Sequence, residues 1–150
     1  MIELENFNFD ISLIFAVLNG RVSAAINRKL AADLKANEVQ ITPEQMTVLS
    51  LLWKKDNVSQ QELCNATFKD KPNMTRLIDS LETKGYVVRV SDQHDRRNNL
   101  INLTAKGREV EEKAFGVANQ TLRKALNNAT IEELKDGQNL LKKIFNNMRE

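Results

Sequence analysis

The stretch that decides the fold runs from Asp70 to Gly107 and reads DKPNMTRLIDSLETKGYVVRVSDQHDRRNNLINLTAKG. Its first half has the apolar spacing of a helix and ends at Gly85. Two aliphatic runs follow, 86–90 and 100–103, and the polar segment SDQHDRRNN joins them. Such runs on both sides of a polar turn are typical of a hairpin. The stretch therefore predicts one helix followed by a β-hairpin.

The predicted helix has recognisable ends and an apolar face. Asp70 can accept hydrogen bonds from the free backbone N–H groups of the first turn, where a proline, Pro72, is also tolerated. Gly85 supplies the left-handed residue that commonly ends a helix. The apolar residues between them recur at helical spacing, so we expect them in the core. They are Met74, Leu77, Ile78 and Leu81.

The opposite side of this helix combines cationic groups with amide, hydroxyl and guanidinium groups. Cations bind phosphates, and the other groups can hydrogen-bond to base edges, so the set suits a DNA major groove. Its members are Lys71, Asn73, Thr75, Arg76 and Ser80. We therefore expect this face to contact DNA. Lys84 and Arg89 lie nearby, but a surface ion pair would equally explain either of them.

The tip of the predicted hairpin carries Arg96 and Arg97 beside Asp95. Guanidinium groups are attracted to the strong negative potential of a narrow minor groove. Asp95 would weaken that attraction unless it holds an arginine in one orientation. A solvated hairpin tip is the simpler interpretation of a charge cluster, but the position directly after the helix favours contact with DNA.

Together these residues resemble the signature of the MarR family of winged-helix transcription regulators. The resemblance consists of four runs in order: TRLIDSLE at 75–82, KGYV at 84–87, DRR at 95–97 and LTAKG at 103–107. It implies a homodimer that binds a pseudo-palindromic operator in double-stranded DNA, with one helix of each subunit in a major groove and one wing at the adjacent minor groove. It also implies that Asp95 orients Arg97, and that a small aromatic or anionic effector, or an oxidant, regulates binding.

Two capping patterns predict two further short helices before Asp70. The segments TPEQ at 42–45 and SQQE at 59–62 each begin with a hydroxyl residue and have Gln or Glu three residues later. Trp53 falls on the buried face of the first of these helices. Three short helices with tight turns give a helix-turn-helix. We therefore expect a mainly α fold with a small β-hairpin wing, in which residues 41–104 form a winged helix-turn-helix DNA-binding region.

Long amphipathic helices are predicted on both sides of this region. At 1.5 Å per residue, a helix over 8–37 would be about 40 Å long, more than a small domain needs for its own core. After the hairpin, Thr104 starts one helix, Asn127 and Asn128 end it, and Thr130 starts another. Their surplus apolar surface favours an intertwined dimer in which 8–37 and 105–150 are dimerisation helices. Packing within one subunit is the alternative.

The composition supports this organisation. A chain of 150 residues, 41% of them hydrophobic, suits a single globular domain. Its net charge of +2 is too small to indicate nucleic acid by itself. However, residues 69–108 hold nine Lys or Arg and five Asp or Glu, a net +4 that leaves −2 for the rest. The positive charge is concentrated where DNA binding by counterion release requires it.

Cys64 is the only cysteine, which excludes an intrachain disulfide and fits a reducing compartment. We expect it to be a small buried hydrophobic residue rather than a redox sensor. The N-terminal MIELENFNFD lacks the basic start of a signal peptide, and the longest apolar run, 13–18, is too short to cross a bilayer. We therefore expect a cytoplasmic protein with no membrane partner.

The sequence has no phosphate-binding loop, nucleophile elbow or HExxH motif. His94 is the only histidine, and although Asp92 and Asp95 flank it, no further Cys or His completes a metal site. We expect no enzyme activity, cofactor or metal. The sequence favours a homodimeric DNA-binding repressor released by a small-molecule effector. The alternatives are a winged-helix module that binds an acidic protein through the same basic face, and a ligand-binding dimer with negligible DNA affinity.

Overall fold

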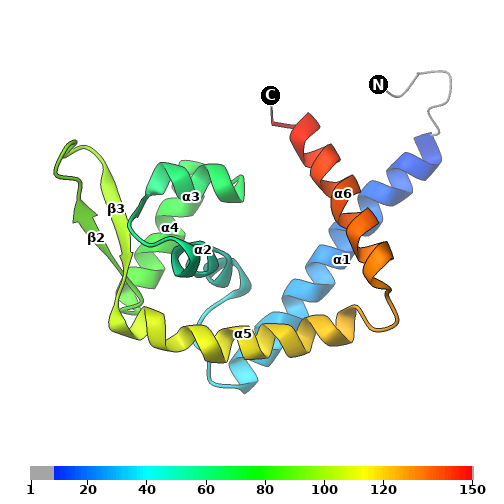
Figure 1. Cartoon of the computed structure of the whole chain (residues 1–150), viewed down its shortest axis with the longest axis horizontal. Helices are drawn as coiled ribbons and strands as arrows, with labels where there is room; N and C mark the ends of the chain where they lie inside the picture. The colour runs from blue at the N-terminus through cyan, green and yellow to red at the C-terminus, as the bar shows by residue number, and fades with distance from the viewer. Residues whose placement is uncertain (1–8, 150) are drawn as a thin grey trace.

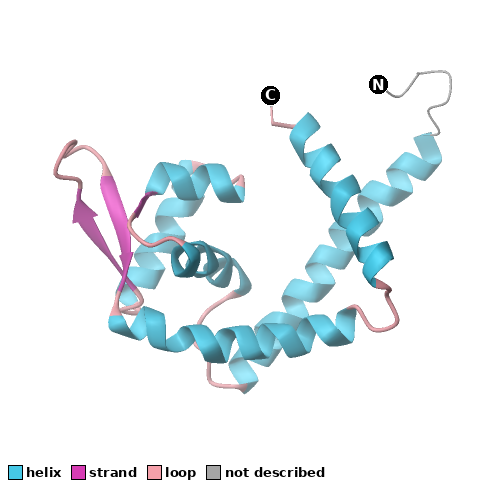
Figure 2. Ribbon diagram, in the orientation of Figure 1, coloured by secondary structure: helices cyan, strands magenta, loops and turns pink. Residues whose placement is uncertain are grey.

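The computed structural model describes residues 9–149, which form six helices and a three-stranded sheet at one edge of the molecule (Figure 1, Figure 2). In order they are α1 (Phe9–Ala36), α2 (Pro43–Lys54), β1 (Val58–Ser59), α3 (Gln60–Thr67), α4 (Lys71–Thr83), β2 (Val87–Ser91), β3 (Asn99–Leu103), α5 (Ala105–Ala125) and α6 (Ile131–Asn147). The predicted mainly α fold with a small wing is confirmed. The expectations for residues 1–8, among them the signal-peptide argument and the helix start at residue 8, and for residue 150 fall outside the described residues.

Helix α5 connects two parts of the molecule. Figure 1 shows α2, α3, α4 and the sheet at one end of α5, and α1 with α6 towards its other end. We call the first part the winged helix. Its helices α2, α3 and α4 form the predicted helix-turn-helix, and β2 and β3 form the wing.

The predicted capping residues start the helices. A capping box, in which a hydroxyl and the side chain three residues later each bind the other's backbone N–H, begins three helices. The pairs are Thr42 with Gln45, Ser59 with Glu62 and Thr130 with Glu133. Helix α5 ends at Ala125, two residues before the asparagines that were predicted to end it, and Asn128 follows in the turn to α6 with a left-handed backbone, φ of 68°.

The winged helix has a core drawn from all its elements. Fully buried side chains include Leu49 of α2, Leu63 of α3, Ile78 of α4, Val87 of β2 and Ile101 of β3. The sheet has the order β1-β3-β2 with both pairs antiparallel. The third strand was not predicted: β1 is two residues long and pairs Val58 with Ile101. The wing is therefore attached to the start of α3.

Helices α1 and α5 pack against each other and against the winged helix. Leu34 of α1 is fully buried, and the Thr121 hydroxyl of α5 donates to Asp33 of α1 at 2.7 Å. At the other end of α5, the Trp53 indole N–H donates to the Gly107 carbonyl at 2.8 Å. Trp53 is half-buried against the core, as predicted.

Helix α6 contributes nothing to this core. None of its side chains from Ile131 to Asn147 is buried. Its contact with the winged helix is an edge-on ring pair, Phe145 with Phe68, at 5.3 Å between centroids. The exposed apolar residues on α1 and α6 include Leu13, Val17, Leu18, Val22, Leu134, Leu140, Leu141 and Ile144.

Candidate nucleic-acid interface

Helix α4 is built as its sequence predicts. The Asp70 side chain accepts the backbone N–H of Asn73 at 2.8 Å, and the left-handed Gly85, with φ of 78°, follows the helix end. Met74, Ile78 and Leu81 are fully buried, and Leu77 packs half-buried against the same core. These contacts fix the apolar side of α4 and leave its polar side outward.

The exposed polar side of α4 is already ordered by hydrogen bonds among its own side chains. Asn73 donates to the Asp70 carboxylate at 2.8 Å and accepts a hydrogen bond from the Arg76 guanidinium. Lys71 is exposed at the start of the same face. Amide, guanidinium and ammonium groups therefore lie together at the first two turns, where a recognition helix contacts base edges.

Two of the five predicted contact residues are less accessible. Thr75 is half-buried, and its hydroxyl accepts from the Gln60 amide of α3 at 2.7 Å. Ser80 is also half-buried, and its hydroxyl accepts from the Gln45 amide of α2 at 2.8 Å. DNA contact by either residue stays a prediction, but each has a partner inside the protein.

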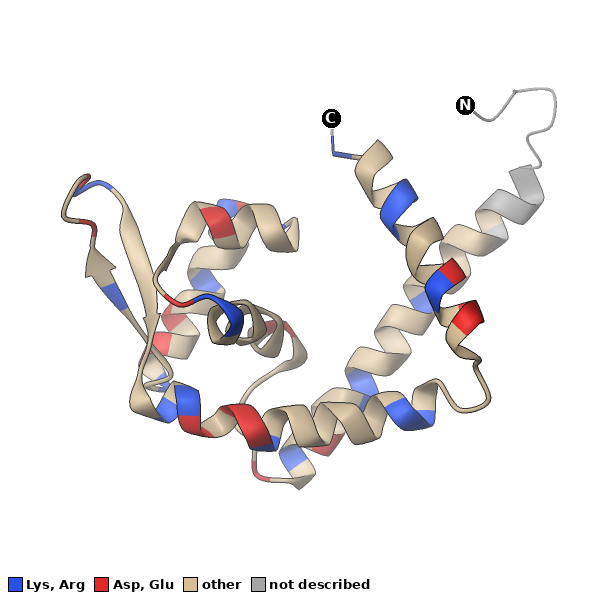
Figure 3. Ribbon diagram, viewed as in Figure 1, with Lys and Arg blue, Asp and Glu red and all other residues tan. Residues whose placement is uncertain are grey.

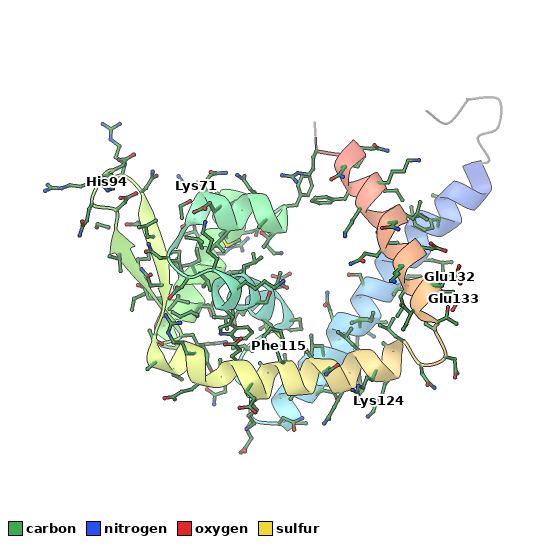
Figure 4. All side chains as sticks on the ribbon, in the orientation of Figure 1. Lys71, His94, Phe115, Lys124, Glu132 and Glu133 are labelled. Carbon is green, nitrogen blue, oxygen red and sulfur yellow. The ribbon has the colours of Figure 1, made fainter. Side chains whose placement is uncertain are left out.

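The wing presents its arginines at an exposed tip. Arg96 and Arg97 are both exposed in the loop between β2 and β3. The Asp95 carboxylate accepts the backbone N–H of Arg97 at 3.0 Å and the side-chain amide of Asn98 at 3.3 Å. Asp95 thus shapes the loop that carries Arg97, through the backbone rather than through the guanidinium. Figure 4 shows His94 at this tip and Lys71 along the same edge of the molecule.

The two basic residues of uncertain role have partners within the protein. Arg89 of β2 makes ion pairs at 2.5 Å with both Asp79 and Glu82 of α4, and only 20% of its side chain is exposed. Lys84 donates to the Gln45 side-chain carbonyl at 2.9 Å. The ion-pair alternative therefore holds for Arg89, and Lys84 is bonded to an uncharged amide. Figure 3 shows basic positions on the wing loop and on strand β2, with acidic positions among them.

Comparison with known proteins identifies the family. A family model described as the MarR family matches residues 39–98. The multiple antibiotic resistance protein MarR of Escherichia coli is 31% identical over 131 residues, which cover 84% of this chain and 90% of that protein. The chain belongs to the MarR family.

Other MarR-related proteins extend this match. YdgJ of Bacillus subtilis, described as an uncharacterized HTH-type transcriptional regulator, is 31% identical over 72% of this chain and 66% of its own length. The HTH-type transcriptional regulator TtmR of Methylorubrum extorquens is 34% identical over 71% of this chain, and the matched segment covers 52% of the length of TtmR. A structure of the C80S mutant of E. coli MarR complexed with operator DNA superimposes with a TM-score of 0.81 at 26% identity, covering 93% of this chain and 99% of that one.

His94 and Cys64 are the remaining candidate residues of this MarR-family chain. Among the described residues, no group of three or more His, Cys, Asp or Glu is arranged to hold a metal ion, and His94 is exposed. Cys64 is a free, buried thiol, and burial raises its pKa. Within residues 9–149, every helix is too short or too polar to span a membrane.

Proposed function

We propose that the chain is a homodimeric, sequence-specific DNA-binding repressor that a small-molecule effector releases from its operator. The observation that carries this proposal is the exposed polar face of α4, where Lys71, Asn73 and Arg76 lie together. Lys71, at the start of this face, lies on the same edge of the molecule as His94 at the wing tip (Figure 4). A face of this composition can bond phosphates and base edges at once. The winged-helix relative in complex with operator DNA supports the same use.

In this proposal each subunit binds half of a pseudo-palindrome. The helix α4 enters the major groove, and the wing lies at the adjacent minor groove. The contact residues are Lys71, Asn73, Thr75 and Arg76 on α4, and Arg96 and Arg97 on the wing with Asp95 fixing their loop. Ser80, the fifth residue predicted on this face of α4, acts in this proposal through its hydrogen bond with Gln45. The division of labour is the predicted one: residues 41–104 bind DNA, whereas 8–37 and 105–150 form the dimer.

The unburied apolar surface of α1 and α6 supports the dimer. Monomeric soluble proteins rarely expose contiguous apolar patches of this kind. In α6 the apolar residues Leu134, Leu141 and Ile144 recur at helical spacing, and 37–44% of each is exposed. A second copy of the chain would cover this face and would hold two α4 helices about 34 Å apart, one turn of DNA.

A cavity between α1, α2 and α5 supports the effector. It has a volume of about 410 Å³, within the range of small-molecule sites. Its lining includes Leu30, Pro43, Met46, Thr47, Phe115 and Leu122. Phe115 offers a ring for an aromatic effector, whereas none of the described lining residues is a Lys or Arg that would favour an anion. We therefore propose an aromatic, largely uncharged effector that binds between the dimer helices and the winged helix.

The experiment that tests the proposed function is a selection of random-sequence duplexes on the purified protein at about 0.15 M salt, followed by titration of the winner against salt. We expect an inverted repeat with half-sites about one DNA turn apart, and affinity that falls steeply with salt. If no sequence is enriched and binding is weak at all salt concentrations, the repressor proposal is wrong. The basic face would then serve an acidic protein partner.

A substitution tests the wing contact directly. Arg97→Ala should weaken operator binding by about 1–3 kcal/mol without changing the unfolding temperature, because Arg97 is exposed and its side chain forms no hydrogen bond or ion pair with any residue from 9 to 149. Arg123→Ala, the same change at an exposed position near the end of α5, is the matched control and should leave affinity unchanged. Equal affinity of a folded Arg97→Ala dimer and the wild type would contradict the assignment.

The proposed setting is the cytoplasm, where a repressor meets its operator, and the lone reduced Cys64 fits that setting. The proposal includes no catalytic step, cofactor or metal. Regulation would come from the different affinity of the effector for the DNA-competent and released arrangements of the two winged helices.

A further inference from the structure

Gln45, the third residue of α2, is a buried polar side chain with partners on two elements. Only 4% of it is exposed. Its carbonyl oxygen accepts the Thr42 backbone N–H at 3.1 Å, as the capping box requires, and also the Lys84 ammonium at 2.9 Å. Its amide nitrogen donates to the Ser80 hydroxyl at 2.8 Å. The side chain that starts α2 therefore also holds the end of α4.

This two-point attachment restricts the rotation of α4. Ser80 and Lys84 are four residues apart, so both lie on one side of the helix. Turning α4 about its axis would break both bonds and leave the buried Gln45 amide unpaired, which is costly away from water. The same rotation would redirect Arg76, one turn before Ser80, relative to a DNA groove. Gln45 thus fixes the rotation of α4 about its axis, and the contacts of α4 in a DNA groove depend on that rotation.

The first turn of α2 has a second neighbour. Pro43, Met46 and Thr47, which flank Gln45 in sequence, line the cavity between α1, α2 and α5. One helical turn therefore contacts the cavity on one side and the recognition helix on the other. We propose that Gln45 is a positioning residue for operator binding, which holds α4 through Ser80 and Lys84 and couples it to the turn that lines the cavity. The inference rests on the proposed function.

Four variants test the positioning role on the operator obtained by selection. They are Gln45→Met, Ser80→Ala, Lys84→Met and the double variant Gln45→Met with Ser80→Ala. We expect each single change to weaken specific binding by about 3- to 30-fold. The double variant should bind no more weakly than Gln45→Met alone, because both changes break the same bond. The salt dependence should stay that of the wild type, since no phosphate contact is lost.

Thr42→Ala is the matched control. It removes the capping hydroxyl and so destabilises the start of α2, but it leaves the bonds from Gln45 to Ser80 and Lys84 in place. Its operator affinity should stay near that of the wild type although its unfolding temperature falls. If Thr42→Ala loses as much affinity as Gln45→Met, general destabilisation explains the effect and the positioning role is wrong.

Coupling to the cavity is tested without knowing the effector. Thr47→Trp places a large side chain at the cavity wall and acts as a tethered occupant. It should weaken operator binding in the wild-type background and have a much smaller effect in the Gln45→Met background. Equal effects in the two backgrounds would show that Gln45 does not transmit the change.

Other outcomes separate this inference from the proposed function. Additive losses for Gln45→Met and Ser80→Ala would indicate that Ser80 contacts DNA by itself. A salt slope reduced by about one in Lys84→Met would indicate a phosphate contact. Either result, or wild-type affinity in a folded Gln45→Met dimer, overturns the inference while the repressor proposal stands. If the wild type selects no sequence, the proposed function fails, and the positioning role fails with it.

Discussion

Replacing Gly107 by alanine would put a methyl group where the protein has a backbone carbonyl. A Cβ at this position would lie 2.1 Å from the Tyr86 carbonyl oxygen and 3.2 Å from the Leu103 side chain. The carbonyl cannot simply turn away, because it accepts the backbone N–H of Thr104 at 3.0 Å. The start of α5 must therefore move relative to the base of the wing.

The loss of stability in Gly107→Ala depends on the atom that the added Cβ contacts, which here belongs to the backbone. Overpacking usually destabilises by about 1–3 kcal/mol, and a backbone partner at such a short distance puts the cost at the upper end. Alanine gains at most about 1 kcal/mol over glycine in helix propensity. We therefore expect Gly107→Ala to lower the free energy of unfolding by about 2 kcal/mol. For a chain of this length the unfolding temperature should fall by about 4–8 °C.

The assay is thermal unfolding at one fixed protein concentration, because the stability of a dimer depends on concentration. Trp53 is the only tryptophan and donates to the Gly107 carbonyl, so its fluorescence gives a second readout of the shifted helix. Gly116→Ala, in the same helix with nothing within 4 Å of the added Cβ, is the control. It should gain up to about 1 kcal/mol. A Gly107→Ala protein as stable as Gly116→Ala would refute the reasoning.

Three further predictions follow from other contacts. Arg89→Met should cost about 1 kcal/mol of stability, because Asp79 and Glu82 lose their shared partner, and high salt should reduce the difference in urea unfolding; equal stability at low salt would contradict this. Cys64 should react slowly with iodoacetamide at neutral pH, since burial raises its pKa and leaves 7% exposed; rapid alkylation would show an accessible thiol. The Ser59 backbone N–H, and then Lys55, hold the pKa of Glu62 below its ordinary 4.5, so its stabilisation is present above that pH and is lost as the pH falls through the folded-state pKa. Glu62→Gln should therefore lose stability less steeply than the wild type in acid unfolding between about pH 5 and 3.

Much of the fold could be predicted because its signals are local. An Asp cap and a Gly stop predicted α4, and the structure has it from Lys71 to Thr83, with Gly85 left-handed just after it. The wing strands differ from the predicted runs by a single residue at three of their four ends. Caps, periodicity and turn residues each act within a few positions, so one sequence is enough to reveal them.

The contacts that orient the candidate site could not be predicted in the same way. The capping box at the start of α2 was a sufficient explanation for Gln45 in the sequence. In the structure Gln45 also bonds Ser80 and Lys84, which are 35 and 39 residues away in sequence. Strand β1 has two residues, too few to show any alternation. For Ser80 and Arg89 the sequence indicated polar groups near the groove face, but only the packing of α2 and β2 on α4 shows their partners.

The order of the strands in the sheet also affects how the protein avoids aggregation through its exposed strand edge. Because β3 is paired on both sides, β2 alone offers a free wing edge, with Val88 and Val90 exposed along it. Such an edge invites pairing with a strand of another molecule. In the middle of β2, however, the backbone N–H of Arg89 donates to the Glu82 carboxylate at 3.2 Å. A charged side chain and an occupied amide at that point act against edge-to-edge aggregation, in a hairpin that must stay exposed.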